Sequence, residues 1–439
     1  QSKTIDEVFT GKPLTTIPVG NAEDVTAAFA KARAAQRIWA ARGVKERSAI
    51  IERYRDLVIA NRDFLMDVCQ AETGKARSAA QEEILDIMLN ARYYARQATK
   101  LLASKRVPGL LPAVVKTVVN HHPKGVVGVI APWNYPMTLS ISDAIPALLA
   151  GNAVVVKPDS QTPYCTLANA ELLYQAGLPR DLFAVVPGPG SVVGTAIVQQ
   201  CDYLMFTGSS ATGRTLAEQC GSRLIGFSAE LGGKNPMIVT KGANLSEVAK
   251  AATRACFSNA GQLCISIERI YVERDGADEF AAKFAEQVRA MQLSATYDFT
   301  ADMGSLISED QIKTISNHVD DAKAKGAKVI AGGNARPDIG PLFYEPTVLT
   351  DVTDEMECGR NETFGPVVSI YPVDSVEEAI AKANDTEYGL NASVWAASKS
   401  QGEAIAARIK SGTVNGDEGY ALAFGSVAAP MGGMKASGV

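Results

Sequence analysis

The sequence predicts an α/β protein with a doubly wound, parallel sheet followed by a second α/β unit. Five short apolar runs between residues 126 and 227 are separated by helix-like segments, and a similar alternation resumes near residue 236. The chain has 439 residues, of which 46% are hydrophobic and 21% are charged. A chain of this size and composition can bury a large core without disulfides or metals. Disorder and fibrous repeats are therefore not expected.

The first hundred residues are predicted to be mostly helical. Asn21 can cap a helix that carries Val25, Phe29 and Ala32 on one side. Apolar residues then recur at helical spacing between 47 and 83. The β-branched stretch VPGLLPAVVKTVVNHH, at 107–122, predicts a hairpin that projects from the body.

The predicted parallel sheet comes next. Near-continuous apolar strands separated by helices are typical of a sheet that is covered on both faces. Five such strands predict a nucleotide-binding sheet. The expected strands are VVGVI (126–130), AVVV (153–156), FAVV (183–186), YLMF (203–206) and LIGF (224–227), and the expected helices lie at 162–175, 191–200 and 212–219.

The second unit is predicted to begin with the strand PMIV at 236–239. Asn244, followed by Glu247 three residues later, predicts a capped helix that ends near residue 259. A loop at 260–265 then leads to the strand RIYVE. Further strand and helix units are expected up to about residue 420.

Charge and cysteine content exclude several classes of protein. The net charge of −5 gives no electrostatic reason to expect binding to nucleic acid or to an anionic membrane. Seven cysteines without a C-x-x-C pair, together with only three histidines, predict no disulfide framework and no metal site. A reducing, cytoplasmic compartment is expected. The uncharged stretch at 125–142 contains two prolines and an asparagine, so it is predicted to be buried irregular structure rather than a membrane span.

Three residues are candidates for catalysis. Cys264 follows a Gly-containing turn and could be an exposed nucleophile, although most unpaired cysteines are buried packing residues. Glu230 precedes two glycines at a strand end, where it could act as a general base or only cap a turn. Asn134, in APWNYP, could donate to an oxyanion or cap its own backbone. A papain-like pair is disfavoured because His318 is 54 residues from Cys264.

The ends of two predicted strands are candidates for nucleotide binding. Lys157 and Ser160 end one of them, in VVVKPDSQTP. In FTGSSATGR, Gly208 and Ser209 follow a strand, and a helix begins near Gly213. The spacing is not G-x-G-x-x-G, so this segment alone favours an ordinary strand-to-helix turn over a phosphate-binding loop.

Taken in order, these motifs resemble the aldehyde dehydrogenase superfamily over essentially the whole chain. The matching segments are PWNYP, GNAVVVKP, FTGSSATG, ELGGKNP, NAGQLC, ETFGPV and PMGGMKASG. The 34 residues between Glu230 and Cys264 match the spacing of base and nucleophile in that family. The resemblance implies a cofactor-binding domain at 1–104 and 123–230 and a catalytic domain at 231–421. Bridging segments at 105–122 and 422–439 would form a homodimer or homotetramer.

The resemblance also implies a mechanism. Cys264 would attack the aldehyde, and Asn134 and the Cys264 backbone N–H would stabilise the oxyanion of the thiohemiacetal. Hydride would leave for the nicotinamide, and Glu230 would activate the water that hydrolyses the thioacyl enzyme. A coenzyme A-acylating relative is an alternative, but Glu230 favours water over a thiol. A non-catalytic descendant is a further alternative, and the presence of all three residues speaks against it.

For the cofactor, the resemblance implies NADP as the preferred partner, with NAD accepted. Many NAD-preferring relatives have a glutamate where this chain has Ser160, so a 2′-phosphate would meet no negative charge there. The residues implied to contact the cofactor are Ile130, Ala131, Trp133, Lys157, Ser160, Gly208, Ser209, Thr212, Gly213, Leu231, Glu362 and Phe364.

The segments KPDSQTP and ETFGPVVSIYPVDSVEEAI resemble those of the succinate-semialdehyde dehydrogenase branch of the family. Members of that branch usually bind the distal carboxylate of the substrate with two arginines. Ser142 and Ser258 occupy those positions here. A pocket with these serines would also suit a general aliphatic or aromatic aldehyde. The residues implied to line the pocket are Tyr135, Ser142, Ser258, Leu263 and Ile265.

Overall fold

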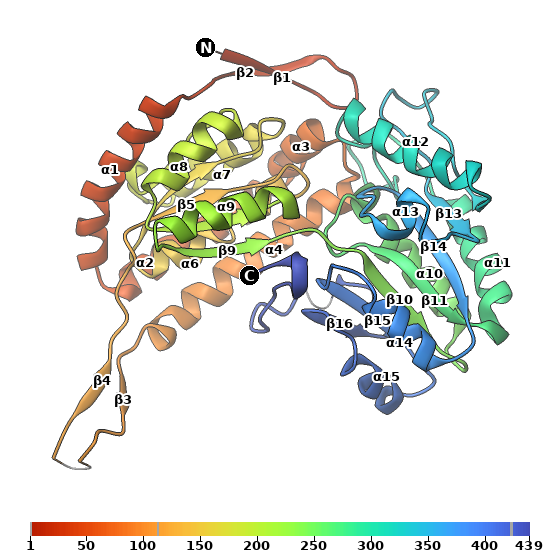
Figure 1. Cartoon of the computed structure of the whole chain (residues 1–439). Helices are drawn as coiled ribbons and strands as arrows, with labels where there is room; N and C mark the ends of the chain where they lie inside the picture. The colour runs from red at the N-terminus through yellow and green to blue at the C-terminus, as the bar shows by residue number, and fades with distance from the viewer. Residues whose placement is uncertain (1, 112–113, 422–424) are drawn as a thin grey trace.

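The chain forms two lobes, and each lobe is built on its own sheet (Figure 1). The computed structural model describes residues 2–111, 114–421 and 425–439. The first lobe contains the five-stranded parallel sheet that the sequence predicts. Its strands, in spatial order, are β7 (Phe183–Val185), β6 (Ala153–Lys157), β5 (Val126–Ile130), β8 (Tyr203–Thr207) and β9 (Gly226–Glu230).

The strand order reverses beside β5, which is the place where a doubly wound sheet binds a nucleotide. One strand boundary differs from the prediction. The strand expected at 224–227 begins at Gly226, because Leu224 has a left-handed φ of 54° and is the last turn residue before it. The shift places Glu230 at the carboxyl end of β9, level with the ends of the other strands.

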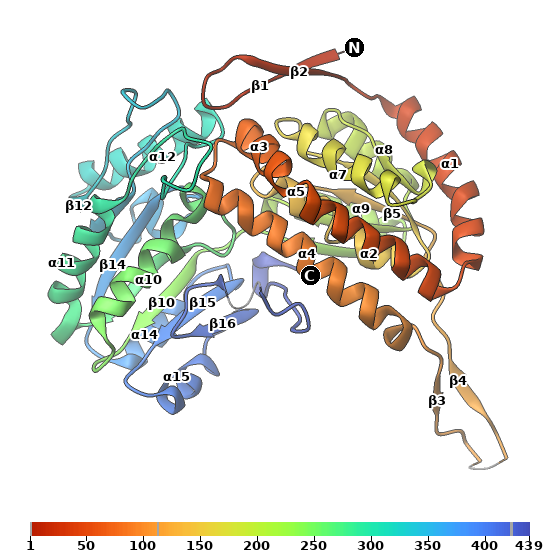
Figure 2. The ribbon, with the colours of Figure 1, turned by 180° about the vertical axis from the view of Figure 1, so that it is seen from behind.

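Helices cover both faces of this sheet (Figure 2). The region at 47–83, where helical spacing was predicted, spans parts of three helices, since the chain breaks at Asn61 and at Gly74, whose φ is 71°. On one face lie α1 (Ala22–Ala41), α8 (Thr195–Gln200) and α9 (Ser210–Ser222). On the other lie α6 (Ala144–Leu149) and α7 (Pro163–Gln175), backed by α2 (Val44–Ala60), α3 (Arg62–Thr73) and α4 (Arg77–Leu101).

The second lobe contains a seven-stranded sheet that is parallel except at one edge strand, β12. The predicted cap is present, because the Asn244 side chain accepts the N–H groups of Ser246 and Glu247 at the start of α10 (Leu245–Phe257). α10 and α11 (Arg274–Ala290) cover one face, and α14 (Val376–Asn384) and α15 (Lys399–Ala406) cover the other. The strands, in spatial order, are β12 (Lys328–Ala331), β13 (Thr347–Thr350), β14 (Val367–Val373), β11 (Ile267–Glu273), β10 (Asn235–Val239), β15 (Asn391–Trp395) and β16 (Thr413–Gly416).

Two hairpins lie outside these sheets (Figure 1). The predicted one, β3 (Lys105–Val107) with β4 (Thr117–Val119), projects from the first lobe. The second, β1 (Ser2–Asp6) with β2 (Pro13–Pro18), is a correction to the mostly helical prediction for the first hundred residues. Its strands are short and mostly exposed, so they carry little apolar pattern.

The hairpin β1–β2 contacts both lobes. Lys3 Nζ donates to the Ser160 carbonyl oxygen in the first lobe, at 2.6 Å. In the second lobe, the Tyr297 hydroxyl donates to Glu7 at 2.5 Å, and the ring of Phe9 stacks on that of Phe343 with 6.1 Å between their centres. The hairpin therefore joins the two lobes at the end opposite the projecting β3–β4 hairpin (Figure 1).

Parts of two predicted segments lie outside the described residues. These are 112–113, within the hairpin region 105–122, and 422–424, at the start of the bridging segment 422–439. Within the described part of the chain, no helix combines the length and the apolar composition that a bilayer crossing requires.

Candidate active site

The loop that carries Cys264 has an unusual backbone. After α10, the short 3-10 helix η3 (Ser258–Gly261) contains Asn259 and Ala260 with left-handed φ values of 51° and 54°. Gly261 follows with φ 69°, and a Cβ atom there would lie 2.1 Å from the Gly365 carbonyl oxygen. Only glycine fits this close approach. The loop leaves Cys264 partly exposed, whereas the other six cysteines are buried, which favours the nucleophile interpretation.

Asn134 is hydrogen-bonded to this same loop. Its Nδ2 donates to the Gln262 carbonyl oxygen at 3.2 Å. In return, Asn259 Nδ2 donates to the Asn134 carbonyl oxygen at 3.0 Å. An amide nitrogen has two N–H groups, and the bond to Gln262 uses one. The other is the group that could stabilise an oxyanion beside Cys264.

Glu230 ends β9 and faces the same cavity as Cys264. Its Oε2 is buried and has no hydrogen-bond partner among the described residues. Burial, together with the charge of Asp143, raises the pKa of Glu230 to about 7. A carboxylate with a pKa near neutrality can take a proton from water at physiological pH, as a general base must.

The three candidate catalytic residues line one cavity of about 480 Å³. Of the predicted pocket residues, Tyr135, Ser142 and Leu263 also line it. Four polar residues of α4 form one wall of the cavity, and the sequence analysis did not predict them. Their helical spacing was the signal that could have placed them on one side of a helix. That wall consists of Asp86, Asn90, Tyr93 and Tyr94, and the cavity is completed by Asp143 and residues 426–431.

Two predicted pocket residues do not line this cavity. Ile265 is 1% exposed and packs in an apolar cluster with Tyr135 and Leu263, both of which line the cavity. Ser258 lines a neighbouring pocket, and its Oγ accepts a hydrogen bond from the Tyr420 hydroxyl at 2.7 Å. The turn at η3 lies between the end of α10 and Cys264, and the substrate-binding roles of Ser258 and Ile265 stay predictions.

The residues expected to bind the cofactor gather at the carboxyl edge of the first sheet. Ser209 caps α9 by accepting the N–H of Thr212, and a Cβ atom at Gly213 would lie 2.6 Å from the Leu231 side chain. A helix N-terminus that opens at this edge suits a pyrophosphate. The predicted residues at or just beyond the strand ends are Ile130, Ala131 and Trp133 after β5, Lys157 and Ser160 after β6, Gly208 and Ser209 after β8, and Leu231 after β9.

The surroundings of Lys157 fit an anionic ligand. Lys157 is 5% exposed, and its Nζ donates to the Pro158 carbonyl oxygen at 2.8 Å. Burial lowers its pKa, against the opposing charge of Asp159. A buried ammonium with a carbonyl partner is stabilised by an anion. Lys3 Nζ reaches the Ser160 carbonyl oxygen, so a second cation lies beside that position.

Glu362 and Phe364 lie at the junction of the two lobes. Glu362 Oε1 accepts the N–H of Gly233 at 2.8 Å, and burial raises the pKa of Glu362 to about 8, with a further contribution from the charge of Glu268. The rings of Trp133 and Phe364 meet edge to face, 5.3 Å apart. This arrangement of Glu362, Trp133 and Phe364 suits a nicotinamide ring and its ribose bound between the lobes, near Cys264.

A buried ion pair that the sequence interpretation missed supports Asn134. Lys75 Nζ and Glu83 Oε1 are 2.5 Å apart, and both side chains are fully buried. Lys75 also donates to the Asn134 carbonyl oxygen at 2.7 Å, and Glu83 Oε2 accepts the N–H groups of Met137 and Thr138. The sequence shows two charged residues in a region of helical pattern, which does not reveal their contact with Asn134. The pair fixes the backbone on both sides of the candidate oxyanion donor.

Comparisons with known proteins agree with this arrangement. A model of the aldehyde dehydrogenase family matches residues 1–439. A Mycolicibacterium smegmatis protein with the provisional name succinate-semialdehyde dehydrogenase (NADP(+)) is 86% identical over 439 residues, which span 100% of this chain and 85% of that protein. The succinate-semialdehyde dehydrogenase (NADP(+)) of Escherichia coli K12 is 35% identical over 431 residues, or 98% of this chain and 88% of that protein.

Solved structures share the fold. A crystal structure described as an E. coli NADP-dependent enzyme superposes with a TM-score of 0.95 at 34% identity, covering 100% of this chain and 90% of that one. A Mycobacterium tuberculosis aldehyde dehydrogenase in complex with NAD+ gives a TM-score of 0.94 at 32% identity, with the same coverage. On its full length, its fold and the order of its motifs, the chain belongs to the aldehyde dehydrogenase family.

Proposed function

We propose that this protein oxidises succinate semialdehyde to succinate, with NADP as the preferred cofactor and NAD as a weaker one. The names of the two relatives support the substrate and the cofactor. The observation that carries the proposal is the single cavity shared by Cys264, Asn134 and Glu230 at the edge of the first sheet. Covalent capture, oxyanion stabilisation and hydrolysis each need one of these side chains.

In the proposed mechanism, Cys264 Sγ attacks the aldehyde carbon. The free N–H of Asn134 and the Cys264 backbone N–H then stabilise the alkoxide, and each such donor typically contributes about 3–4 kcal/mol in the transition state. Lys157, Glu362 and their neighbours would hold NADP, which would accept the hydride that leaves the former aldehyde carbon, so that a thioester remains on Cys264. Glu230 takes a proton from the water that hydrolyses the thioester.

A broad-specificity aldehyde dehydrogenase is the second candidate function. Serines replace the two carboxylate-binding arginines, and Asp86 and Asp143 line the cavity. A coenzyme A-acylating enzyme is less favoured, since a thiol acceptor does not need Glu230. Product analysis with and without coenzyme A separates hydrolysis from acyl transfer.

We expect the hydrolytic half-reaction to accelerate as the pH rises through about 7. Only ionised Glu230 can accept a proton, and its pKa is raised to about 7 by burial and by Asp143. Release of the acid product in a single turnover, measured from pH 5.5 to 8.5, should therefore increase and level off above neutrality. Asp143→Asn removes the repelling charge, so its midpoint should lie at lower pH. A rate that falls with rising pH would contradict the role of Glu230.

Ser160→Glu should move the cofactor preference from NADP to NAD. A carboxylate at this position would repel the 2′-phosphate and could accept from the 2′-hydroxyl, so KM for NADP should rise by about 100-fold. The measurement is kcat/KM for both cofactors with succinate semialdehyde. Ser160→Ala, which adds no charge, is the matched control. The assignment is wrong if the glutamate variant keeps the preference of the wild type.

Assembly, domain roles and location are further parts of the proposal. The segments 1–104 and 123–230 would hold the cofactor, and 231–421 would carry the nucleophile. A homodimer or homotetramer is supported by exposed apolar residues on the β3–β4 hairpin, which are Leu110, Leu111, Val114, Val115, Val118 and Val119. A cytoplasmic location is supported by seven free cysteines.

A further inference from the structure

An arginine lies next to the catalytic cavity, in a pocket that adjoins it. A smaller pocket of about 160 Å³ adjoins that cavity and shares Asp86, Tyr135 and Leu263 with it. Among the described residues that line the two, Arg254 is the sole lysine or arginine. A substrate carboxylate that extends from Cys264 past Tyr135 and Leu263 would meet this guanidinium.

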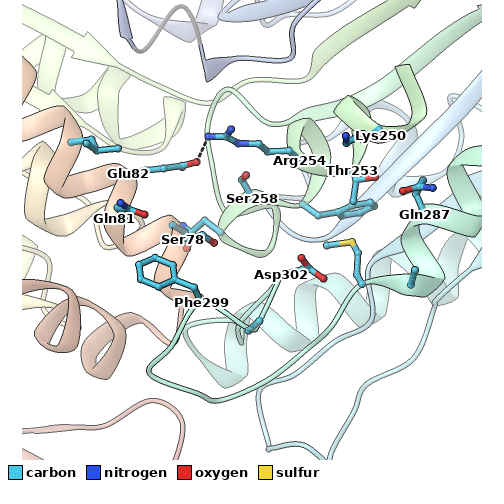
Figure 3. Close-up of a pocket in the computed structure, with 17 residues that line it drawn as sticks. Ser78, Gln81, Glu82, Lys250, Thr253, Arg254, Ser258, Gln287, Phe299 and Asp302 are labelled. Carbon is cyan, nitrogen blue, oxygen red and sulfur yellow. Dashed lines mark hydrogen bonds and ion pairs between the residues drawn. The ribbon is translucent and has the colours of Figure 1, made fainter. Parts of the chain in front are cut away.

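Arg254 lies in the last turn of α10, four residues before Ser258, which is the residue directly after the helix ends. Ser258 occupies a position where semialdehyde dehydrogenases are expected to have an arginine. Figure 3 shows the Arg254 side chain extending from α10 above Ser258 towards Glu82 on α4. Arg254 and Ser258 line the same pocket beside the catalytic cavity.

The present partners of Arg254 leave donors for a ligand. Its Nη2 donates to Glu82 Oε1 at 2.7 Å, and its guanidinium lies 5.8 Å from the centre of the Tyr420 ring. The Tyr420 hydroxyl oxygen lies 3.1 Å from Glu82 Oε1 and 2.7 Å from Ser258 Oγ, and its one hydrogen can be donated to either of them. A guanidinium has five N–H groups in a planar fork that suits a carboxylate. The pair with Glu82 therefore orients Arg254 without using all of its donors.

The carboxyl groups across the cavity do not exclude an anion. Asp86 already accepts from Asn90 Nδ2 at 2.9 Å and from the Thr138 hydroxyl. Burial raises the pKa of Asp86 to about 6 and that of Asp143 to about 7. Both groups can take up a proton near neutrality, which reduces their repulsion of a bound carboxylate.

We propose that Arg254 binds the distal carboxylate of semialdehyde substrates and shares its guanidinium between that carboxylate and Glu82. The inference rests on the proposed function and adds a specificity-determining residue to it. It also explains how a chain with serines at positions 142 and 258 could bind the carboxylate of a semialdehyde substrate.

The test compares three aldehydes that differ in charge: succinate semialdehyde, butanal and the cationic betaine aldehyde. For Arg254→Gln, KM for succinate semialdehyde should rise by about 10- to 100-fold, the usual effect of losing a charge-assisted hydrogen bond. KM for butanal should stay the same, and KM for betaine aldehyde should fall. Glu82→Gln removes the competing carboxylate and should lower KM for succinate semialdehyde.

Lys250→Gln is the matched control. Lys250 precedes Arg254 by one turn of α10 and lines the neighbouring pocket that contains Ser258 (Figure 3), but neither the catalytic cavity nor the smaller pocket that adjoins it. It should leave all three KM values unchanged. A KM for succinate semialdehyde that does not change in Arg254→Gln overturns the inference. An equal rise for succinate semialdehyde and butanal also overturns it, because such a rise reports a structural role. A wild-type enzyme that turns over butanal but does not prefer succinate semialdehyde overturns the proposed substrate instead.

Discussion

Replacing Cys264 with alanine should abolish reduction of NADP by any aldehyde, including the first turnover. Without the sulfur no tetrahedral alkoxide can form on the enzyme, and a free aldehyde is a poor hydride donor. In another enzyme, removal of a covalent nucleophile lowers kcat by on the order of 10⁶-fold. Stopped-flow absorbance at 340 nm should therefore show neither a burst nor a steady rate.

Cys358→Ala is a suitable control for this experiment. Cys358 is also a free thiol, but it is buried in the core of the second lobe and does not line the cavity. Its loss should lower stability slightly and leave the burst intact. Steady turnover in Cys264→Ala, in a protein that is folded and binds NADP, would reject the covalent mechanism.

Glu230→Gln should separate the two half-reactions. Hydride transfer does not need the carboxylate, so one equivalent of NADPH per site should still form in a burst. Hydrolysis should slow by about 10²- to 10⁴-fold, the usual contribution of a positioned general base. The thioacyl enzyme should then accumulate and be detectable by mass spectrometry of the intact protein.

Hydroxylamine provides the control for the glutamine variant. It is a stronger nucleophile than water and needs less help from a base, so it should restore turnover of the accumulated thioester. Loss of the burst together with the steady rate would mean that Glu230 acts before hydrolysis, for example on the Cys264 thiol. The pKa of that thiol is raised to about 12 by burial and by the charges of Glu230 and Glu362.

The first sheet and the catalytic residues were predictable because their signals are local. Each strand of the first lobe is a short apolar run, and Cys264, Glu230 and Asn134 each lie in a short motif rich in glycine or proline. Such motifs encode special backbone geometry, as the left-handed residues at 259–261 illustrate. The order of the motifs then identified the family.

The rest of the site depends on contacts between distant segments. Lys75 and Glu83 lie eight residues apart in a region of helical pattern, and no local signal reveals that they support Asn134, more than fifty residues later. Likewise, the turn that precedes Cys264 packs Gly261 against the backbone of Gly365, a contact between segments about a hundred residues apart. The hairpin β1–β2 was missed because strands that pair mainly with each other need little apolar pattern.

The hairpin β1–β2 restricts how the two lobes can move relative to each other. Lys3 contacts the loop after β6 in the first lobe, and Phe9 and Glu7 contact the second lobe. The two lobes therefore cannot move apart without breaking these contacts. On heating, the lobes should melt together as one cooperative unit rather than in sequence.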